Sequence, residues 1–295
     1  MVSNVPRDTG LRARTNRGRD EAKARNPKGG DSQSTRSAKK CATVDGKCKE
    51  PPKLPEILMR HIVALSGGKD STAMAFRLAE AEPRDYEYVI TPTGDELPEM
   101  FEHWRNLGEM LGSPLKPLIE VTLDRLIREQ KALPNWRMRW CTRILKIEPF
   151  QKFALESAPC VIYVGLRADE MEREGVTYKS DEITQRFPLR EWGWGLVEVK
   201  AYLEARGISI PRRTDCGMCF FQTLGEWYRL WREHPDKWSQ YEGYEELTGH
   251  TLRSDGRDTW PASLKGLRER FEAGDVPRQR AAMEDRRVMC STCAR

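Results

Sequence analysis

The sequence predicts an α/β protein whose parallel sheet is covered by helices on both faces. Residues 61–65 (HIVAL) form a short apolar run that stops at the turn Ser66-Gly67-Gly68, as a buried parallel strand would. Residues 70–80 then place apolar side chains at helical spacing. This order of strand, glycine turn and helix returns further along the chain, and alternating strands and helices favour a parallel sheet.

The repeats of this unit are visible as apolar runs between polar stretches. Residues 86–91 predict a second strand, residues 100–111 an amphipathic helix, and residues 118–121 a third strand. Residues 160–166 (CVIYVGL) predict a further strand, which is followed by a polar loop over residues 167–173. We therefore expect at least four strands in one sheet.

The remainder of the chain predicts helices and a cysteine-containing loop. Residues 196–206 have a helical pattern, residues 215–221 read as a loop, and residues 224–238 predict a tryptophan-rich amphipathic helix. The aromatic stripe on that helix has two interpretations, stacking on nucleic-acid bases or packing on the core, and packing is the commoner outcome. The last fifty residues are charged and show little periodicity.

Composition limits the class of protein. The chain has 295 residues, of which 38% are hydrophobic and 32% charged, so it has room for one large domain or two modest ones. No run approaches the roughly 18 apolar residues of a membrane span, and charges occupy the place where a signal peptide would be apolar. A membrane partner is therefore not expected, and the expected location is the cytoplasm.

The net charge of +5 is unevenly distributed along the chain. Within residues 1–50, Lys and Arg outnumber Asp and Glu, and no aromatic residue occurs. Residues 1–56 are therefore expected to be a disordered basic tail, either an arm that attracts nucleic acid or a solvated leader. Residues 57–210 are expected to form a nucleotide-binding domain, and residues 211–295 a helical region that holds cysteines.

The strongest chemical signal is the string SGGKDS between the first predicted strand and the first predicted helix. Glycines allow the backbone to turn so that N–H groups form an anion site at the positive end of the helix dipole. Lys69 adds a mobile positive charge for phosphate oxygens, and Ser66 and Ser71 add hydroxyl donors. The spacing differs from that of a Walker A loop, GxxxxGK[ST].

With this loop the chain resembles the PP-loop ATP pyrophosphatases, in the branch that includes the phosphoadenosine phosphosulfate (PAPS) reductases. The resemblance extends from about residue 61 to residue 231 and implies a Rossmann-like sheet, the adenine nucleotide alpha hydrolase fold. It also implies that the loop holds the phosphates of ATP, or the equivalent group of a sulfonucleotide, and that Lys69 and Asp70 are catalytic. The implied nucleotide site consists of Ser66, Gly67, Gly68, Lys69, Asp70 and Ser71.

Three further segments resemble the same branch. The acidic loop after the second strand (TGDELPE) offers Asp95 and Glu96, which with Asp70 would hold Mg²⁺ or a ribose hydroxyl, although a solvated turn is the alternative. The segment GLRADE at the end of a later strand offers Arg167, which would stabilise charge in the transition state. In open parallel sheets, ligands bind beyond the carboxyl ends of the strands, where all these segments would lie.

The third segment, WCTRILK followed by Pro149, is basic. It resembles the family segment in which positive side chains meet the phosphates of the substrate. Four positive charges gather near its cysteine, and they would hold a nucleotide or a nucleic-acid backbone, or form an exposed basic face. The four residues are Arg137, Arg139, Arg143 and Lys146, of which Arg143 and Lys146 are the predicted nucleotide ligands.

The eight cysteines favour metal chemistry over disulfides in a chain without a secretion signal. Two pairs have CxxC spacing, and by resemblance to the iron–sulfur members of the branch Cys141 precedes the first pair at a fitting distance. The predicted 4Fe–4S ligands are Cys141, Cys216, Cys219 and one of Cys290 or Cys293. The alternatives are a zinc site on the two CxxC pairs, or buried or free thiols, and Cys160 is expected in the core.

The resemblance implies an enzyme that uses ATP and Mg²⁺ to adenylate a nucleic-acid or nucleoside substrate, for sulfur transfer or a related modification. Similar proteins include the sulfurtransferase components of DNA phosphorothioation and the tRNA 2-thiocytidine synthetases, so a sulfur-donor protein is an expected partner. One alternative is a sulfonucleotide reductase with a divergent thiol tail, since the chain ends in MCSTCAR without the reductase string ECG[IL]H. The other alternative is a non-catalytic nucleic-acid binder.

Overall fold

A five-stranded parallel sheet forms the centre of the described part of the chain. The computed structural model describes residues 59–256 and 258–277, all of which belong to one compact unit that begins at Leu54. The strand order is β3-β2-β1-β4-β5, and every neighbouring pair is parallel. The strands are β1 (Arg60–Ala64), β2 (Tyr86–Ile90), β3 (Lys116–Pro117), β4 (Cys160–Val164) and β5 (Ile183–Arg186). This arrangement confirms the predicted Rossmann-like α/β class.

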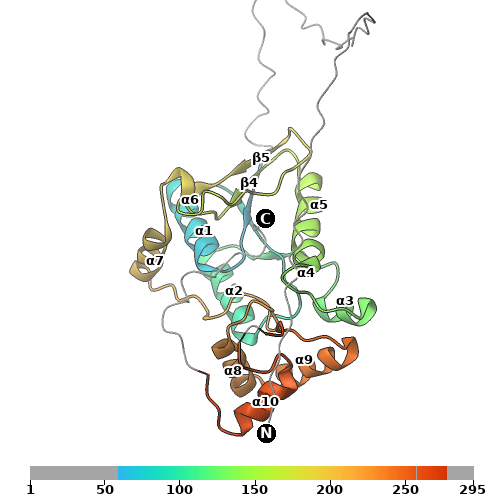
Figure 1. Ribbon diagram of the computed structural model, residues 1–295. Coiled ribbons are helices and arrows are strands. Elements are labelled where there is room, and N and C mark those ends of the chain that lie inside the picture. Colours follow the sequence, from blue (N-terminus) through green and yellow to red (C-terminus); the bar gives the residue numbers. More distant parts are fainter. Residues whose placement is uncertain (1–58, 257, 278–295) are drawn as a thin grey trace, which may run out of the picture. The chain divides into compact units, whose positions relative to one another are not determined.

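Alternate residues of the strands face two separate cores, as the period of two in a strand requires. Val63, Tyr88 and Tyr163 belong to one core with buried residues of α1, α2 and α7. Ile62 and Ile162 point to the other face, where α5 covers them. Figure 1 shows α1 and α5 on opposite sides of the sheet. Because both faces are buried, the strands read as nearly continuous apolar runs.

The helices α1, α2 and α7 lie where the sequence predicted helices. The helices are α1 (Lys69–Ala81), α2 (Pro98–Leu111), α3 (Leu123–Gln130), α4 (Trp140–Thr142), the π-helix η2 (Arg143–Ile147), α5 (Glu148–Glu156), α6 (Pro188–Glu191) and α7 (Leu196–Ala205), with α8 to α10 described below. Pro98 stands at the first position of α2, where its missing N–H is not needed, and Gly112 ends that helix at a positive φ of 65°.

A third core holds the helices α8 (Leu224–Glu233), α9 (Pro235–Thr248) and α10 (Leu264–Glu272). The single helix predicted over residues 224–238 is wrong, because the chain breaks at His234 and restarts at Pro235, which cannot donate a backbone hydrogen bond. Trp227 and Trp238 are fully buried in this core. The packing interpretation of the tryptophan stripe is therefore confirmed, since rings inside the core are not free to stack on bases.

The structure also differs from the sequence-based predictions at elements whose formation depends on strand pairing or tertiary packing more than on the local residue pattern. The third strand comprises only Lys116–Pro117, which pair with the end of β2, and residues 118–121, predicted as strand, form a bend. The edge strand β5 was not predicted, nor were the helices α3, α4, η2, α5, α6 and α10. None of the described helices is long and apolar enough to cross a membrane. The basic tail and the last eighteen residues, including Cys290 and Cys293, lie outside the described residues, and the domain boundary at residue 210 stays a prediction.

Candidate functional site

The SGGKDS loop joins β1 to α1, and its two serines tie it together. The Ser66 N–H donates to the Ser71 hydroxyl at 3.2 Å, and the Gly68 N–H donates to the Ser66 hydroxyl at 3.2 Å. The two hydroxyl oxygens lie 2.9 Å apart. Among the described residues no side chain caps the start of α1, so the backbone donors of its first turn are left for a ligand. This geometry suits a phosphate at the positive end of the helix.

Helix α2 holds the outer side of the loop through two side chains that the sequence analysis did not single out. The His103 ring donates through Nε2 to the carbonyl oxygen of Gly67 at 3.0 Å, and the Trp104 indole donates to that of Ser66 at 3.2 Å. Gly67 has a φ of +80°, which glycine tolerates best. Both carbonyl groups are thus bound to α2. The sequence carries no motif at residues 103 and 104 that marks this contact.

The buried ring of His103 predicts a pH dependence of stability. Burial, partly opposed by the hydrogen bond to Gly67, lowers the pKa of His103 below its ordinary value of 6.5. The unfolded chain then binds the proton more readily, so the unfolding free energy should fall as the pH drops below 6.5. We expect His103→Gln to remove this component in urea unfolding at several pH values.

His250, which is exposed, supplies the matched control. His250→Gln should leave the pH dependence of unfolding as it is in the wild type. Equal pH dependence in the wild type and in His103→Gln would contradict the assignment.

Arg167 approaches the first turn of α1 and is surrounded by carboxylates. Its Nη1 donates to Asp70 Oδ2 at 2.9 Å, its Nε donates to Asp169 at 2.8 Å, and its Nη2 lies 3.2 Å from Glu170. The close approach depends on Gly165, since a Cβ there would lie 3.0 Å from the backbone nitrogen of Ser71. The predicted pair of Asp70 and Arg167 is thus in direct contact.

Asp70 is buried and keeps one oxygen without a partner. Oδ2 accepts from Arg167, whereas Oδ1 has no hydrogen-bond partner among the described residues. Burial raises the pKa of the Asp70 carboxyl, although the charges of Arg167 and Lys69 oppose the shift. An unsatisfied buried acceptor beside the phosphate site fits a cation or a donor group of a ligand.

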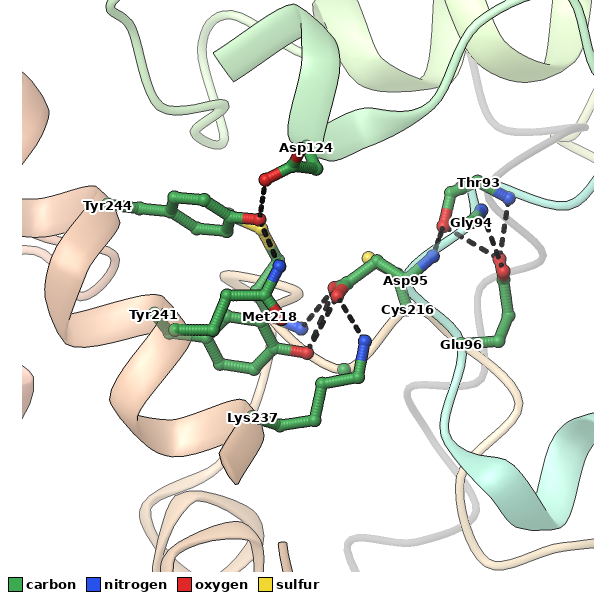
Figure 2. A network of polar contacts seen from close by, with 12 residues as sticks. Thr93, Gly94, Asp95, Glu96, Asp124, Cys216, Met218, Lys237, Tyr241 and Tyr244 are labelled. Atoms are coloured by element: carbon green, nitrogen blue, oxygen red, sulfur yellow. Dashed lines mark hydrogen bonds and ion pairs between the residues drawn. The ribbon is translucent and has the colours of Figure 1, made fainter. Parts of the chain in front are cut away.

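The acidic loop uses its carboxylates within the protein. Glu96 accepts from the N–H and hydroxyl of Thr93 at 2.8 and 2.7 Å and from the N–H of Gly94 at 3.0 Å. These bonds bend the loop tightly, and Figure 2 shows them beside Asp95. Glu96 is therefore occupied in holding its own loop, and its predicted role as a ligand of Mg²⁺ stays a prediction.

Asp95 is the centre of a network that joins the acidic loop to α9 and to the cysteine loop (Figure 2). Its carboxylate accepts from the Tyr241 hydroxyl at 2.9 and 3.0 Å, from Lys237 Nζ at 2.9 Å, and from the N–H of Met218 at 3.2 Å. Its carbonyl oxygen accepts from the N–H of Gly217 at 2.7 Å. Asp95 thus has a structural role that the sequence did not predict, while Mg²⁺ binding by this residue stays a prediction.

Three of the five predicted cysteine ligands line one cavity of about 280 Å³. Cys141 comes from α4, whereas Cys216 and Cys219 come from the loop before α8. The hydrogen bond between Cys216 and Cys219 lowers the pKa of Cys219 and, together with burial, raises that of Cys216. Within the described ranges, no three His, Cys, Asp or Glu side chains are arranged as a formed metal site.

The predicted basic residues divide between the cavity and the surface. Lys146 and Arg139 line the cavity beside the cysteines. Arg143 instead forms an exposed ion pair with Glu148 at 2.7 Å, and Arg137 lies over the ring of Trp136. The positive charges are therefore gathered around the cavity, but not all of them line it.

The phosphate loop and the cysteine cavity share neighbouring residues. A Cβ at Gly68 would lie 3.6 Å from the hydroxyl of Thr214, and the next residue, Asp215, lines the cavity with Cys216. Thr93 of the acidic loop also lines the cavity. Of the four segments predicted to converge, GLRADE contacts the SGGKDS loop through Arg167 and Asp70. The acidic loop and the basic segment line the same cavity through Thr93, Cys141 and Lys146.

A parallel sheet with strand order β3-β2-β1-β4-β5 and a glycine loop between β1 and α1 places the chain in the Rossmann-like class of α/β proteins. The chain belongs to the phosphoadenosine phosphosulfate reductase domain family, which matches residues 60–229. An uncharacterised protein of Methanocaldococcus jannaschii is 26% identical over 197 residues, which are 61% of this chain and 40% of that protein. The chain thus spans about two fifths of the length of that curated relative.

Two solved structures are similar at low sequence identity. The PAPS reductase of Candida auris, in its phosphate complex, is 16% identical with a TM-score of 0.41, over 51% of this chain and 74% of that one. The U34-tRNA thiolase NcsA of Methanococcus maripaludis, with its 4Fe–4S cluster, is 17% identical with a TM-score of 0.40, over 74% of this chain and 82% of that one.

Proposed function

We propose that the protein is an ATP-dependent enzyme that adenylates a nucleic-acid or nucleoside substrate for sulfur transfer or a related modification. In this reaction an oxygen of the substrate attacks the α-phosphorus of ATP, the bond to the bridging oxygen breaks, and pyrophosphate leaves. The adenylated carbon or phosphorus can then accept sulfur, with AMP as the second leaving group.

The observation that carries the proposal is the contact between the phosphate loop and the cysteine cavity. A Cβ at Gly68 of the SGGKDS loop would lie 3.6 Å from the Thr214 hydroxyl, and the next residue, Asp215, lines the cavity with the cysteines. A nucleotide bound at the loop would have its activated acceptor beside the thiols. Activation and sulfur delivery require such proximity, because the adenylate must meet its sulfur source before water reaches it.

The phosphate loop supplies the nucleotide-binding part of the mechanism. The first turn of α1 and Lys69 would bind the leaving pyrophosphate, and Ser66 and Ser71 fix the loop around it. The orphan Oδ1 of Asp70 is the described oxygen that best fits Mg²⁺, since those of Asp95 and Glu96 are bonded within the protein. Arg167 orients Asp70 by its ion pair.

The donor chemistry of the cavity fits a thiolate-bound metal group. Cys141, Cys216 and Cys219 would hold it, with Cys290 or Cys293 as the proposed fourth ligand, and Lys146 and Arg139 would offset the thiolate charge. Three thiols on one cavity can serve a 4Fe–4S cluster or a zinc ion, and we propose the cluster because Cys141 precedes the first CxxC pair as in the iron–sulfur members that the chain resembles. When bound, such a cluster supplies an iron site that can carry sulfur.

Pyrophosphate release from ATP, measured with and without RNA and DNA, tests the proposed reaction. We expect Lys69→Ala to reduce nucleotide affinity and pyrophosphate release about tenfold, because a charge-assisted contact to phosphate is lost. The exposed residue Lys265 on α10 gives the control, since Lys265→Ala should match the wild type.

Other outcomes of the same assays would replace the proposal. Thiol-dependent release of sulfite from PAPS or adenosine phosphosulfate, lost in Cys290→Ser or Cys293→Ser, would identify a sulfonucleotide reductase. Nucleic-acid affinity without nucleotide turnover, unaffected by Lys69→Ala, would identify a non-catalytic binder.

Metal analysis of protein purified without oxygen tests the cluster independently of activity. We expect about four irons with sulfide and absorbance near 400 nm, and loss of both in Cys219→Ser. Cys160→Ala, at a buried cysteine of β4, should retain the iron. One zinc and no iron would instead make the CxxC loop a structural clasp.

A further inference from the structure

A short loop between α3 and α4 exposes large apolar side chains. Trp136 is 57% exposed and Met138 is 58% exposed, two residues apart on the same loop. Phe221, from the loop that follows the CxxC motif, is 40% exposed. An exposed tryptophan and an exposed phenylalanine thus come from the two segments that carry the cysteines of the cavity.

The loop is held in a defined shape although its tip is exposed. The Asn135 side chain accepts from the N–H groups of Arg137 and Met138 at 3.0 and 2.9 Å, and the Asn135 N–H donates to the Met138 carbonyl at 3.2 Å. These three bonds close a compact turn around Trp136. A prearranged aromatic side chain loses little conformational entropy when it binds a ligand.

An arginine accompanies each exposed ring. The Arg137 guanidinium lies 4.7 Å from the centre of the Trp136 ring, and that of Arg139 lies 5.4 Å from the centre of Phe221. Among the described residues neither arginine forms an ion pair, in contrast to Arg143 with Glu148, and Nε of Arg139 is buried without a partner. Stacking rings next to unneutralised arginines are the combination that binds bases and phosphates of single strands.

Two of these residues reach the cysteine cavity. Arg139 and Phe221 line it together with Cys141, Cys216 and Cys219, so the aromatic and basic surface continues into the cavity wall. A strand bound outside would therefore have a nucleotide within reach of the thiols. A folded duplex keeps its bases stacked and offers only phosphates to such a surface, which leaves the two exposed rings unused.

From these contacts we propose that Trp136, Arg137, Met138, Arg139 and Phe221, here named the Trp136 surface, bind unpaired bases of a single-stranded nucleic-acid segment at the cysteine cavity. This inference rests on the proposed function, for which it names the substrate class. Trp136 and Phe221 stack on bases, and Arg137 and Arg139 contact the phosphates between them.

The test measures binding of fluorescein-labelled single-stranded 20-mers, one RNA and one DNA, to the full chain by anisotropy. We expect Trp136→Ala to raise the Kd at least about fivefold and Trp136→Phe to restore much of the affinity, because stacking tolerates another aromatic ring. Arg137→Ala should reduce the slope of log K against log salt concentration by about 0.7. Comparison of RNA with DNA identifies the strand that is preferred.

The matched control is Phe101→Ala on α2, because Phe101 is 49% exposed but lines a different groove. This variant should bind both strands within about twofold of the wild type. Three outcomes would each contradict the proposed role of the Trp136 surface. They are equal losses of affinity in Phe101→Ala and Trp136→Ala, duplex binding as tight as single-strand binding, and no binding by the wild type.

Pyrophosphate release by the wild type separates the two proposals. If the wild type releases pyrophosphate while Trp136→Ala binds single strands as tightly as the wild type, the proposed role of the Trp136 surface is wrong and the proposed function stands. If the wild type binds strands through Trp136 but never releases pyrophosphate from ATP, the surface stands and the adenylation reaction is wrong.

Discussion

Replacing Gly67 by alanine should weaken nucleotide binding more than a hundredfold and lower the free energy of unfolding by about 3 kcal/mol. Gly67 has a φ of +80°, where a Cβ is strained, and that Cβ would collide with the end of Met100 and lie 2.6 Å from Trp104 Nε1. The end of Met100 can move aside, but Trp104 is held by its hydrogen bond to Ser66, so relief of the collision displaces the loop or breaks that bond. The backbone donors of the phosphate site then lose their common direction.

Gly112 offers a control that separates strain from collision. It also has a positive φ, +65°, but a Cβ there would meet no described atom within 4 Å. Gly112→Ala should therefore cost about 1 kcal/mol of stability from backbone strain alone and leave nucleotide binding unchanged. Urea unfolding and calorimetric titration with a nonhydrolysable ATP analogue measure both quantities. Similar nucleotide affinities of the two variants would show that the SGGKDS loop is not the phosphate site.

Replacing Asp95 by alanine should lower the free energy of unfolding by about 3 kcal/mol and open the cysteine loop. The change leaves the N–H of Met218 and the hydroxyl of Tyr241, both buried, without their acceptor, and each lost partner costs about 1–3 kcal/mol. Burial raises the pKa of Asp95 although the charge of Lys237 opposes the shift, so the ion pair does not fully offset the desolvation of the carboxylate. We therefore attribute the lost stability of Asp95→Ala to the lost hydrogen bonds more than to the lost ion pair.

The reaction rate of the thiols tests this expectation, and a variant of a second carboxylate in the same network, Asp124, provides the control. The rate at which Cys216 and Cys219 react with a disulfide reagent should rise severalfold in Asp95→Ala, since the side-chain acceptor of the Met218 N–H is gone. Gly217 keeps its hydrogen bond to the backbone carbonyl of residue 95 in this variant. Asp124, which accepts from Tyr244 at 2.6 Å but is 42% exposed, is the control (Figure 2). Asp124→Ala should cost about 1 kcal/mol because water replaces the carboxylate. Equal losses in both variants would contradict a special role of Asp95.

Local chemistry explains what could be predicted from the sequence. The strand before Ser66, the glycine turn and the helix after it are visible because apolar period and turn residues are short-range properties. The grouping of Cys141 with Cys216 and Cys219 followed from the family resemblance, and the structure places these three side chains on one cavity. Edge strand β5 was missed, since ITQR has no apolar pattern and forms a strand only by pairing with β4.

The amino-acid sequence by itself determined the α/β class and the glycine turn between β1 and α1, because these depend on neighbouring residues. Only the tertiary structure decided which partner each polar group finds. Asp95 meets Lys237 and Tyr241 across more than 140 residues of chain, and His103 meets Gly67 across 36. No local pattern encodes such pairs, since they form when packing brings distant donors and acceptors together and burial requires each to be satisfied.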